Sequence, residues 1–357
     1  MADPRRDRQH LSRLIRAHGD GDLIAASILQ PGLRLFETSY GVWAYHRVRG
    51  VDVTLGGPLC AAHDRAAMVR RFLASSRWPL LVYLRAPMLD ALAGTGLHCA
   101  GIGVDRHVDL EALRARPSKP VQGAIKKARK AGLELRALDL DALDPATRQR
   151  LDAITSAYLA HAKVNTEMAF LNWPMSARAD GLRRVYALIK RDREHHGMFG
   201  YAVLNPIFRD GRQTGWLLDI LRFEPTRLWG VWLSVVHALA EIAAREGMQL
   251  CVGFAPLHRV EPAPVAGSRT LQAQIDWMVR YLSTTPYLMR LRELKDAIAG
   301  VEEPRYLASF TRCAPIVVAA FLDAMAVPLP SLSLGATLRI LGEGAQLQAR
   351  RRFGTRP

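Results

Sequence analysis

Residues 215–232 hold the residue types whose spacing is best suited to chemistry. An apolar run that contains Asp219 and Arg222 is followed by Arg227 and then by Gly230, which opens an apolar helical pattern. The first turn of a helix exposes unpaired N–H groups and the positive end of the helix dipole. The stretch therefore predicts a strand, a loop with two arginines and a helix whose start suits an anion such as phosphate.

Asp219 and Arg222 lie three residues apart on the expected strand. Side chains alternate between the two faces of a regular strand, so these two would point to opposite faces. They can act together only if a β-bulge or the strand end lies between them.

The rest of the chain alternates between strand-like and helix-like segments, which predicts an α/β (α+β) fold and excludes all-helical and all-β folds. Strands are expected at 33–37, 41–48, 51–55, 80–84, 200–205, 214–221 and 250–254. Helices are expected at 11–17, 64–74, 88–93, 121–131, 144–161, 181–191 and 231–245.

The length of 357 residues is sufficient for two ordinary domains. We expect a basic N-terminal helix and lead-in at 1–30, an N-terminal α/β domain at 31–140 and a C-terminal catalytic α/β domain at 141–312. An apolar and then basic tail follows at 313–357. Its segment 314–341 has two interpretations, a packing helix or an interfacial membrane segment.

The chain is strongly basic, with 49 Lys and Arg against 33 Asp and Glu and a formal net charge of +16. Such an excess attracts nucleic acid, anionic lipid headgroups or a phosphorylated cofactor, and does not choose among them. The helix at 121–131 carries Lys126, Lys127, Arg129 and Lys130. These side chains form either a solvated face or a binding site for nucleic-acid or lipid phosphates.

The four cysteines, Cys60, Cys99, Cys251 and Cys313, form no C-x-x-C pair and no short Cys/His cluster. We therefore expect reduced thiols and no metal site. The N-terminus has no apolar segment behind its charges, so a secretory signal is not expected. The predicted location is the cytoplasm, with a peripheral position on the cytoplasmic membrane face as the alternative.

Several short motifs occur in a fixed order along residues 35–310. They are Leu55-Gly-Gly-Pro58, the stretch 103–110, Lys126-Lys-Ala-Arg-Lys-Ala-Gly132, Glu167-Met-Ala-Phe170, Asp219-Ile-Leu-Arg222 followed by Gly230, Leu294-Lys295 and Pro304-Arg305-Tyr306-Leu307. This series resembles the catalytic domain of the lysylphosphatidylglycerol synthases, here as a stand-alone soluble member. Val104-Asp105 stands where that family has paired glutamates, and Trp232-Leu233 stands where it has Met-Asp.

The resemblance implies two fused GNAT-like domains, each a mixed central sheet flanked by helices. It implies a reaction in which an aminoacyl group moves from aminoacyl-tRNA to an acceptor, with aminoacyl-tRNA as co-substrate and no cofactor. The acceptor would be a hydroxyl or amine of a lipid resembling phosphatidylglycerol or of a small molecule. Asp219 and Arg222 would then be catalytic, and the basic helix would bind tRNA. The substrate-binding residues would be Glu167, Phe170, Arg227, Gly230, Lys295 and Arg305.

Two other function classes stay open. Arg227-x-x-Gly230 resembles the shorter loop by which GNAT enzymes hold a pyrophosphate, which would suit an acyl-CoA-dependent N-acyltransferase. Trp232 argues against an ordinary acetyl-CoA enzyme, because its indole stands where that loop ends in a small residue. The other class is a non-catalytic protein that binds nucleic acid or a membrane surface.

Overall fold

The computed structural model describes residues 4–161, 170–175, 181–191, 197–225, 230–282 and 292–325. Within these ranges, twelve strands form one mixed sheet in the order β1-β2-β3-β5-β12-β6-β11-β10-β9-β8-β7, with β4 paired to β2. The strands are β1 (Arg34–Thr38), β2 (Gly41–Val48), β3 (Val51–Leu55), β4 (Leu59–Cys60), β5 (Pro79–Leu84), β6 (His98–Val108), β7 (Leu133–Leu138), β8 (Arg184–Lys190), β9 (Met198–Arg209), β10 (Arg212–Phe223), β11 (Gln249–Pro256) and β12 (Gly300–Ser309). The helices are α1 (Pro4–His18), α2 (Arg65–Ser75), α3 (Ala86–Leu89), α4 (Leu110–Ala115), α5 (Lys119–Lys130), α6 (Pro145–His161), α7 (Val231–Arg245), α8 (Arg269–Leu282) and α10 (Ala314–Ala324).

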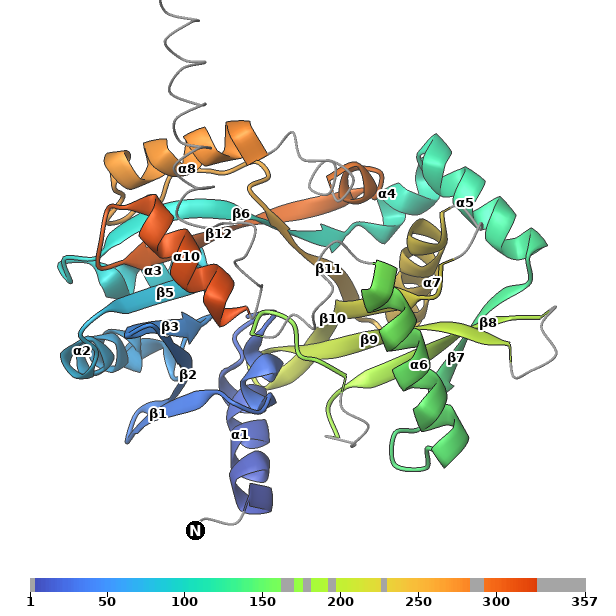
Figure 1. The fold of residues 1–357 in the computed structure, drawn as a ribbon, viewed down its shortest axis with the longest axis horizontal. Helices are drawn as coiled ribbons and strands as arrows, with labels where there is room; N and C mark the ends of the chain where they lie inside the picture. Colours follow the sequence, from blue (N-terminus) through green and yellow to red (C-terminus); the bar gives the residue numbers. More distant parts are fainter. Residues whose placement is uncertain are drawn as a thin grey trace, which may run out of the picture.

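One chain path occurs twice in this sheet. β2 and β3 form an antiparallel hairpin, α2 follows, and β5 returns parallel to β3. Likewise β9 and β10 form a hairpin, α7 follows, and β11 returns parallel to β10. A parallel return needs a crossover connection, which the two helices supply. The fold therefore consists of two fused α/β halves built on the same plan, as expected (Figure 1).

The two halves share one continuous sheet because β6 pairs with β11 on one side and with β12 on the other. β12 follows every other strand in sequence, yet it lies between β5 and β6 in the first half. The domain boundaries at 30, 140 and 312 stay a prediction.

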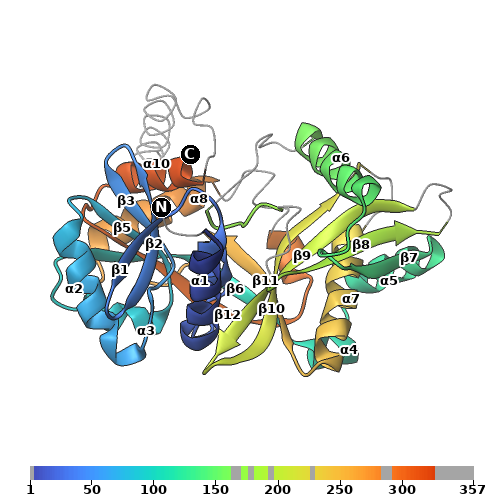
Figure 2. The same ribbon diagram turned by 90° about the horizontal axis from the view of Figure 1, so that it is seen from below.

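Helices cover both faces of the sheet. α6 and α10 lie on one side, and α4 and α7 lie on the other (Figure 2). α7 buries Val235, Val236 and Leu239 against Trp216 of β10 and Leu250 of β11. α5 packs in turn on α7, and both helices belong to the same apolar cluster.

The helix expected at 181–191 is wrong. Residues Arg184–Lys190 form β8, which pairs with β7 and β9. Its residues 185–188 are all buried, so both faces of this strand are covered. A short continuous apolar run fits a buried strand and a buried helical segment equally well. β7, for which the sequence offered no prediction, pairs along the outer side of β8.

Most of the other expected helices and strands are confirmed, whereas β6, β12 and α8 had no predicted counterpart. The helix at 231–245 and the strands at 41–48 and 51–55 have the expected bounds. The four cysteines are free, as expected. Within the described ranges, none of the helices is both long enough and apolar enough to cross a bilayer. Of the segment 314–341, residues 326–341 lie outside the described part.

Candidate active site

β10 and β11 pair with each other over only part of their length. Their parallel register runs from Gly215 to Leu217 on β10 and from Gln249 to Cys251 on β11. β10 nevertheless extends to Phe223 and β11 to Pro256. The two strands therefore part in the middle of the second half, which leaves backbone groups that need other partners.

Asp219 lies on β10 just beyond the paired segment. The register between β10 and β9 shifts between Leu218 and Ile220, so Asp219 is the extra residue of a β-bulge. Its Oδ2 accepts hydrogen bonds from the backbone N–H of Trp173 at 3.0 Å and from Nδ2 of Asn205 at 3.0 Å. Its Oδ1 accepts one from Nδ2 of Asn172 at 3.1 Å.

Burial raises the pKa of Asp219 to about 6, against the lowering effect of the Trp173 N–H, Asn205, Asn172 and the charge of Arg183. A carboxyl group with this pKa is partly ionised near neutral pH. It can therefore both accept and return a proton, which general acid–base catalysis requires.

The bulge places Arg222 on the same side of the sheet as Asp219. Arg222 pairs in register with Tyr201 of β9, and Asp219 bonds Asn205 of the same strand. Tyr201 and Asn205 are four residues apart and so share one face. The guanidinium carbon of Arg222 lies 5.6 Å from the ring centroid of Tyr158 on α6. The irregularity on which this pair depends is therefore present.

Arg183 fastens the segment that holds Asp219. It is buried, and its guanidinium carbon lies 3.6 Å from the ring centroid of Trp173. Its Nη1 donates to the carbonyl oxygens of Trp173 and Pro174, both at 3.2 Å. This contact fixes the backbone whose N–H group reaches the Asp219 carboxylate.

Phe170 lies in the core rather than on an open surface. Its side chain is 1% exposed, and its φ of +72° is in the left-handed region. Its backbone N–H donates to Oε1 of Gln30 at 2.7 Å, and its carbonyl accepts from Nε2 of Gln30 at 2.8 Å. The structure thus gives Phe170 a position in the frame behind Asn172 and Trp173.

Lys295 is buried among backbone carbonyls. Its Nζ donates to the carbonyl oxygens of Gly253 at 2.7 Å and Phe254 at 2.6 Å, in the stretch of β11 that no longer pairs with β10. Burial lowers the pKa of Lys295 to about 8, against the raising effect of the Asp105 carboxylate. Lys295 therefore satisfies strand carbonyls where the sheet parts.

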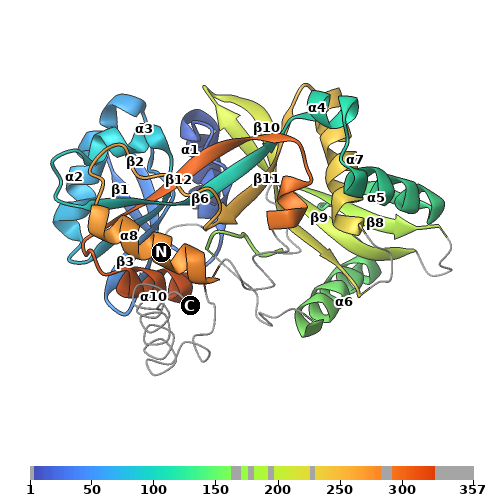
Figure 3. The same ribbon diagram turned by 90° about the horizontal axis from the view of Figure 1, so that it is seen from above.

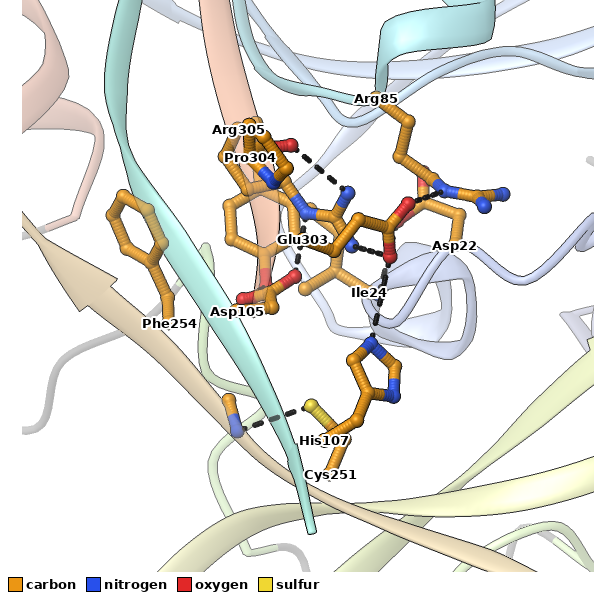
Figure 4. Close-up of polar contacts among 12 residues, drawn as sticks. Asp22, Ile24, Arg85, Asp105, His107, Cys251, Phe254, Glu303, Pro304 and Arg305 are labelled. Atoms are coloured by element: carbon orange, nitrogen blue, oxygen red, sulfur yellow. Dashed lines mark hydrogen bonds and ion pairs between the residues drawn. The ribbon is translucent and has the colours of Figure 1, made fainter. Parts of the chain in front are cut away.

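Arg305 belongs to a charged network on β6 and β12, which Figure 4 shows. Arg305 and Asp105 form an ion pair in which both side chains are 0% exposed. Asp105 also accepts from the hydroxyl of Tyr83 at 2.5 Å, and Arg305 donates to Glu303 at 3.1 Å. Arg85 donates to the same glutamate at 2.7 Å.

Glu303 is held ionised within this network. Burial opposes its charge, but the hydrogen bonds from His107 and Arg305 and the charges of Arg305 and Arg85 outweigh burial, so the pKa of Glu303 is well below its ordinary value. β6 and β11 separate β12 from β10. The structure therefore does not bring Arg305 beside Asp219.

Gly230 and the basic helix α5 meet at the start of α7. Gly230 has a φ of +82°, and a Cβ at this position would lie 2.6 Å from the Cβ of Ala124 on α5. Glycine is therefore needed both for the backbone conformation and for the close approach of α5. The four basic residues of α5, Lys126, Lys127, Arg129 and Lys130, are exposed.

Two of the expected site residues, Glu167 and Arg227, lie outside the described residues. No pattern in the sequence singles out Asn172, Trp173 or Arg183 as site residues, and Asn205 lies at the end of the strand expected at 200–205. Asn172 and Trp173 lie 47 and 46 residues from Asp219 in the chain, so no local pattern connects them to it.

His258, Asp296 and Glu302 form a compact group, with potential ligand atoms within 4.8 Å of one another. Arg106 donates to both Asp296 at 2.9 Å and Glu302 at 2.6 Å. Arg259 donates to the second oxygen of Glu302. Arginines thus already supply the positive charge that a metal ion would bring, and the group is an ion-pair cluster.

Solved structures share this fold. The C-terminal domain of a putative lysylphosphatidylglycerol synthetase from Agrobacterium fabrum superposes with a TM-score of 0.71 at 16% identity, over 90% of this chain and 96% of that one. L-PGS from Bacillus licheniformis gives a TM-score of 0.70 at 16% identity, over 89% and 96%. FemX gives 0.51 at 10% identity, over 87% and 98%. The two α/β halves are therefore the tandem GNAT-like halves that the sequence predicted.

No curated protein sequence matches the chain. Residues 12–309 match the family described as phosphatidylglycerol lysyltransferase, C-terminal. The match spans most of the chain and includes the strands and connecting segments that build the Asp219 site. The chain is therefore a member of the phosphatidylglycerol lysyltransferase C-terminal domain family.

Proposed function

We propose that this protein is an aminoacyl-tRNA-dependent acyltransferase that moves an aminoacyl group to a hydroxyl or amine of a lipid or small-molecule acceptor. Family membership supports the reaction class. The observation that carries the proposal is the Asp219 carboxylate, held in a β-bulge by three donors, with a pKa of about 6 and an arginine on the same side of the sheet.

In the proposed reaction, the oxygen or nitrogen of the acceptor attacks the carbonyl carbon of the aminoacyl ester. Asp219 takes the acceptor proton as the new ester or amide bond forms. The bond to the ribose oxygen at the 3′ end of the tRNA breaks, and that oxygen receives the proton. Asp219 is then ionised again, so the residue ends the cycle unchanged.

The hydrogen bonds of Asp219 favour one oxygen as the proton acceptor. Within the described part of the chain, Oδ2 accepts from two donors and Oδ1 from one. Each carboxylate oxygen has two lone pairs, so Oδ1 keeps one for the substrate proton. The fixed amide donors hold this lone pair in place through the reaction.

The positive side chains have separate roles in this proposal. Arg222 binds a phosphate of the tRNA end or of the acceptor, because a guanidinium matches phosphate oxygens in pairs. The basic residues of α5 bind the acceptor stem, and α5 contacts Gly230 at the start of α7. Glu167 and Arg227 complete the substrate site, while Lys295 and Arg305 act through the frame of the sheet.

A transfer assay tests the proposal. The full chain is incubated with a mixed pool of radiolabelled aminoacyl-tRNAs and with phosphatidylglycerol vesicles or small hydroxyl and amine acceptors. We expect label to move into an acceptor, and Asp219→Asn to slow the transfer about 10²–10⁴-fold because the proton acceptor is lost. Asp210→Asn, in the exposed turn of the same hairpin, is the matched control and keeps full activity.

Two results would contradict the proposal. An Asp219→Asn variant as active as the wild type would remove the carboxylate from the mechanism. Acyl transfer from coenzyme A thioesters, with none from any tRNA, would establish the acyl-CoA-dependent GNAT reaction in its place.

A further inference from the structure

Helix α10 buries mostly small apolar side chains and turns larger apolar side chains outward, whereas an ordinary surface helix turns polar side chains outward. The positions it buries are mostly small, namely Ala314, Val317, Ala320 and Ala324. Ile316 is 49% exposed, and the larger side chains of Val318 and Leu322 stay partly exposed. A surface helix normally turns polar residues outward. The outward face of α10 therefore suits an apolar environment rather than water.

An exposed tryptophan lies near this helix, where strand β5 begins. Trp78, just before β5, is 43% exposed and contacts Phe310 in a tilted arrangement, with ring centroids 5.0 Å apart. The guanidinium carbon of Arg77 lies 5.3 Å from the centroid of the Trp78 ring. Arg49, in the β2–β3 turn, is 73% exposed and forms an ion pair with Asp323, the single charged residue of α10.

Hydrogen bonds and contacts place these residues together, at one end of strands β3, β5 and β12. The N–H of Asp52 donates to the carbonyl of Trp78 at 2.9 Å, and the N–H of Phe310 donates to the carbonyl of Pro79 at 3.3 Å. The starts of β3 and β5 and the end of β12 therefore lie together. α10 contacts β2 and β3 and lies beside α8 (Figure 3).

We propose that α10 and the adjoining ends of β3, β5 and β12 form a docking face for an anionic lipid bilayer. The docking face consists of Ile316, Val318 and Leu322 on α10 together with Trp78, Arg49, Arg77 and the exposed Arg312. The aliphatic side chains enter the boundary between headgroups and acyl chains, where an amphipathic tryptophan is also stable. Arg77 and Arg312 contact lipid phosphates, while Arg49 is paired with Asp323.

Charge decides between a bilayer and a second copy of the chain. In a symmetric dimer the same face would meet itself, so the arginines of one copy would lie near those of the other. Like charges at an interface disfavour association. A bilayer that contains anionic lipid supplies the opposite charge, and the net charge of +16 adds to the attraction.

This inference rests on the proposed function in one respect, because a lipid acceptor would bring the chain to a membrane. Binding is nevertheless measurable without aminoacyl-tRNA. A chain that binds vesicles but transfers nothing would refute the proposed function alone. A chain that transfers to a small molecule but ignores vesicles would refute the docking face alone.

Co-sedimentation of the full chain with vesicles tests the docking face. We expect binding to phosphatidylcholine vesicles that contain phosphatidylglycerol or phosphatidylserine, and little binding to phosphatidylcholine alone. Arg77→Gln with Arg312→Gln should weaken binding about tenfold or more, and Trp78→Ser with Ile316→Ser should do the same. These residues are exposed at the surface, and circular dichroism verifies that the variants fold.

Two controls match the variants. Val301→Ser removes an apolar side chain that is 66% exposed at the opposite end of β12, and Arg70→Gln with Arg71→Gln removes two exposed charges from α2. Both should leave vesicle binding unchanged. The docking face is overturned if wild type ignores anionic vesicles or if the α2 variant loses as much binding as the Arg77 variant. It is also overturned if the Trp78 variant changes only the oligomeric state.

Discussion

The carboxyl groups of Asp219 and Glu303 have pKa values that move in opposite directions. Burial raises the pKa of Asp219 to about 6, and its hydrogen-bond partners are neutral amides. Glu303 is also affected by burial, but His107 and two arginines bring its pKa well below the ordinary value. Asp219 can therefore exchange a proton near neutral pH, whereas Glu303 stays ionised as part of the frame.

The pH dependence of transfer follows from the Asp219 environment. Because Asp219 accepts a proton only when ionised, the rate should rise as pH increases through about 6 and level off above it. Asn205→Ala removes a donor that favours the charged form, so the pKa should move up and the rising limb should move to higher pH. Initial rates across this pH range measure the shift.

Thr214→Ala is the control for this experiment, because Thr214 is exposed on β10, the strand that carries Asp219. This variant should leave the rising limb of the pH profile in place. A limb that does not move in Asn205→Ala would mean that a group other than Asp219 sets the pH dependence.

Asp219 and Arg222 became candidates because both belong to one short motif, Asp219-Ile-Leu-Arg222 followed by Gly230, which resembles the family and is local in the sequence. The expectation that Arg305 contacts substrate could not be checked from the sequence, since its partner Asp105 lies 200 residues away. Burial and pairing of a charged side chain depend on which strands become neighbours. That information is not local.

At the scale of elements, the sequence predicted helices and strands well where the apolar pattern has a clear period. The fifteen residues of α7 show a helical period over four turns and have the expected bounds. β8 has seven residues, too few to separate the two periods, and its burial on both faces removes the alternation typical of a half-exposed strand. The error at 181–191 has this cause.

Gly230 and Gly211 provide a matched pair for the α5–α7 contact. Gly211→Ala, with a φ of +75° and no atom within 4 Å of the added Cβ, should cost only the backbone conformation, about 1–2 kcal/mol. Gly230→Ala has a similar φ of +82° and a contact at 2.6 Å with Ala124, so we expect a further loss of about 1–3 kcal/mol. Urea unfolding measures both.

A second substitution isolates the contact. Ala124→Gly removes the Cβ that the new side chain of Gly230→Ala meets, but it carries its own cost of about 1 kcal/mol for a glycine inside a helix. Measured in the Ala124→Gly background, Gly230→Ala should therefore lose the additional cost and match Gly211→Ala. Equal stability of the Gly230→Ala and Gly211→Ala variants would show that α5 yields at no cost.

At the scale of the whole molecule, the basic helix α5 and the proposed docking face lie at opposite ends. α10 and α2 belong to one end of the sheet and α5 to the other (Figure 2). A tRNA on α5 and a bilayer on the docking face would therefore not compete for surface. This arrangement suits a protein that takes its donor from solution and its acceptor from a membrane.

The salt dependence of tRNA binding tests the assignment of α5. Lys126→Gln with Lys130→Gln should weaken binding and reduce the slope of log K against log salt by about 2, because two phosphate contacts are lost. Filter binding over a range of salt concentrations gives the slope. Arg70→Gln with Arg71→Gln on α2 removes equal charge at the other end of the molecule, and an equal loss in that variant would mean that tRNA has no preferred surface.

The position of β12 has a consequence for biosynthesis. Most of the first half of the fold consists of residues before 140. Its sheet nevertheless lacks β12 (Gly300–Ser309), the strand between β5 and β6, until the end of the chain is synthesised. β5, with six residues, and β6, with eleven, therefore keep unpaired edges while the second half is translated, and such edges invite aggregation. The first half of the fold can complete its sheet only after β12 has been translated. The two halves are therefore synthesised one after the other but reach their folded state together.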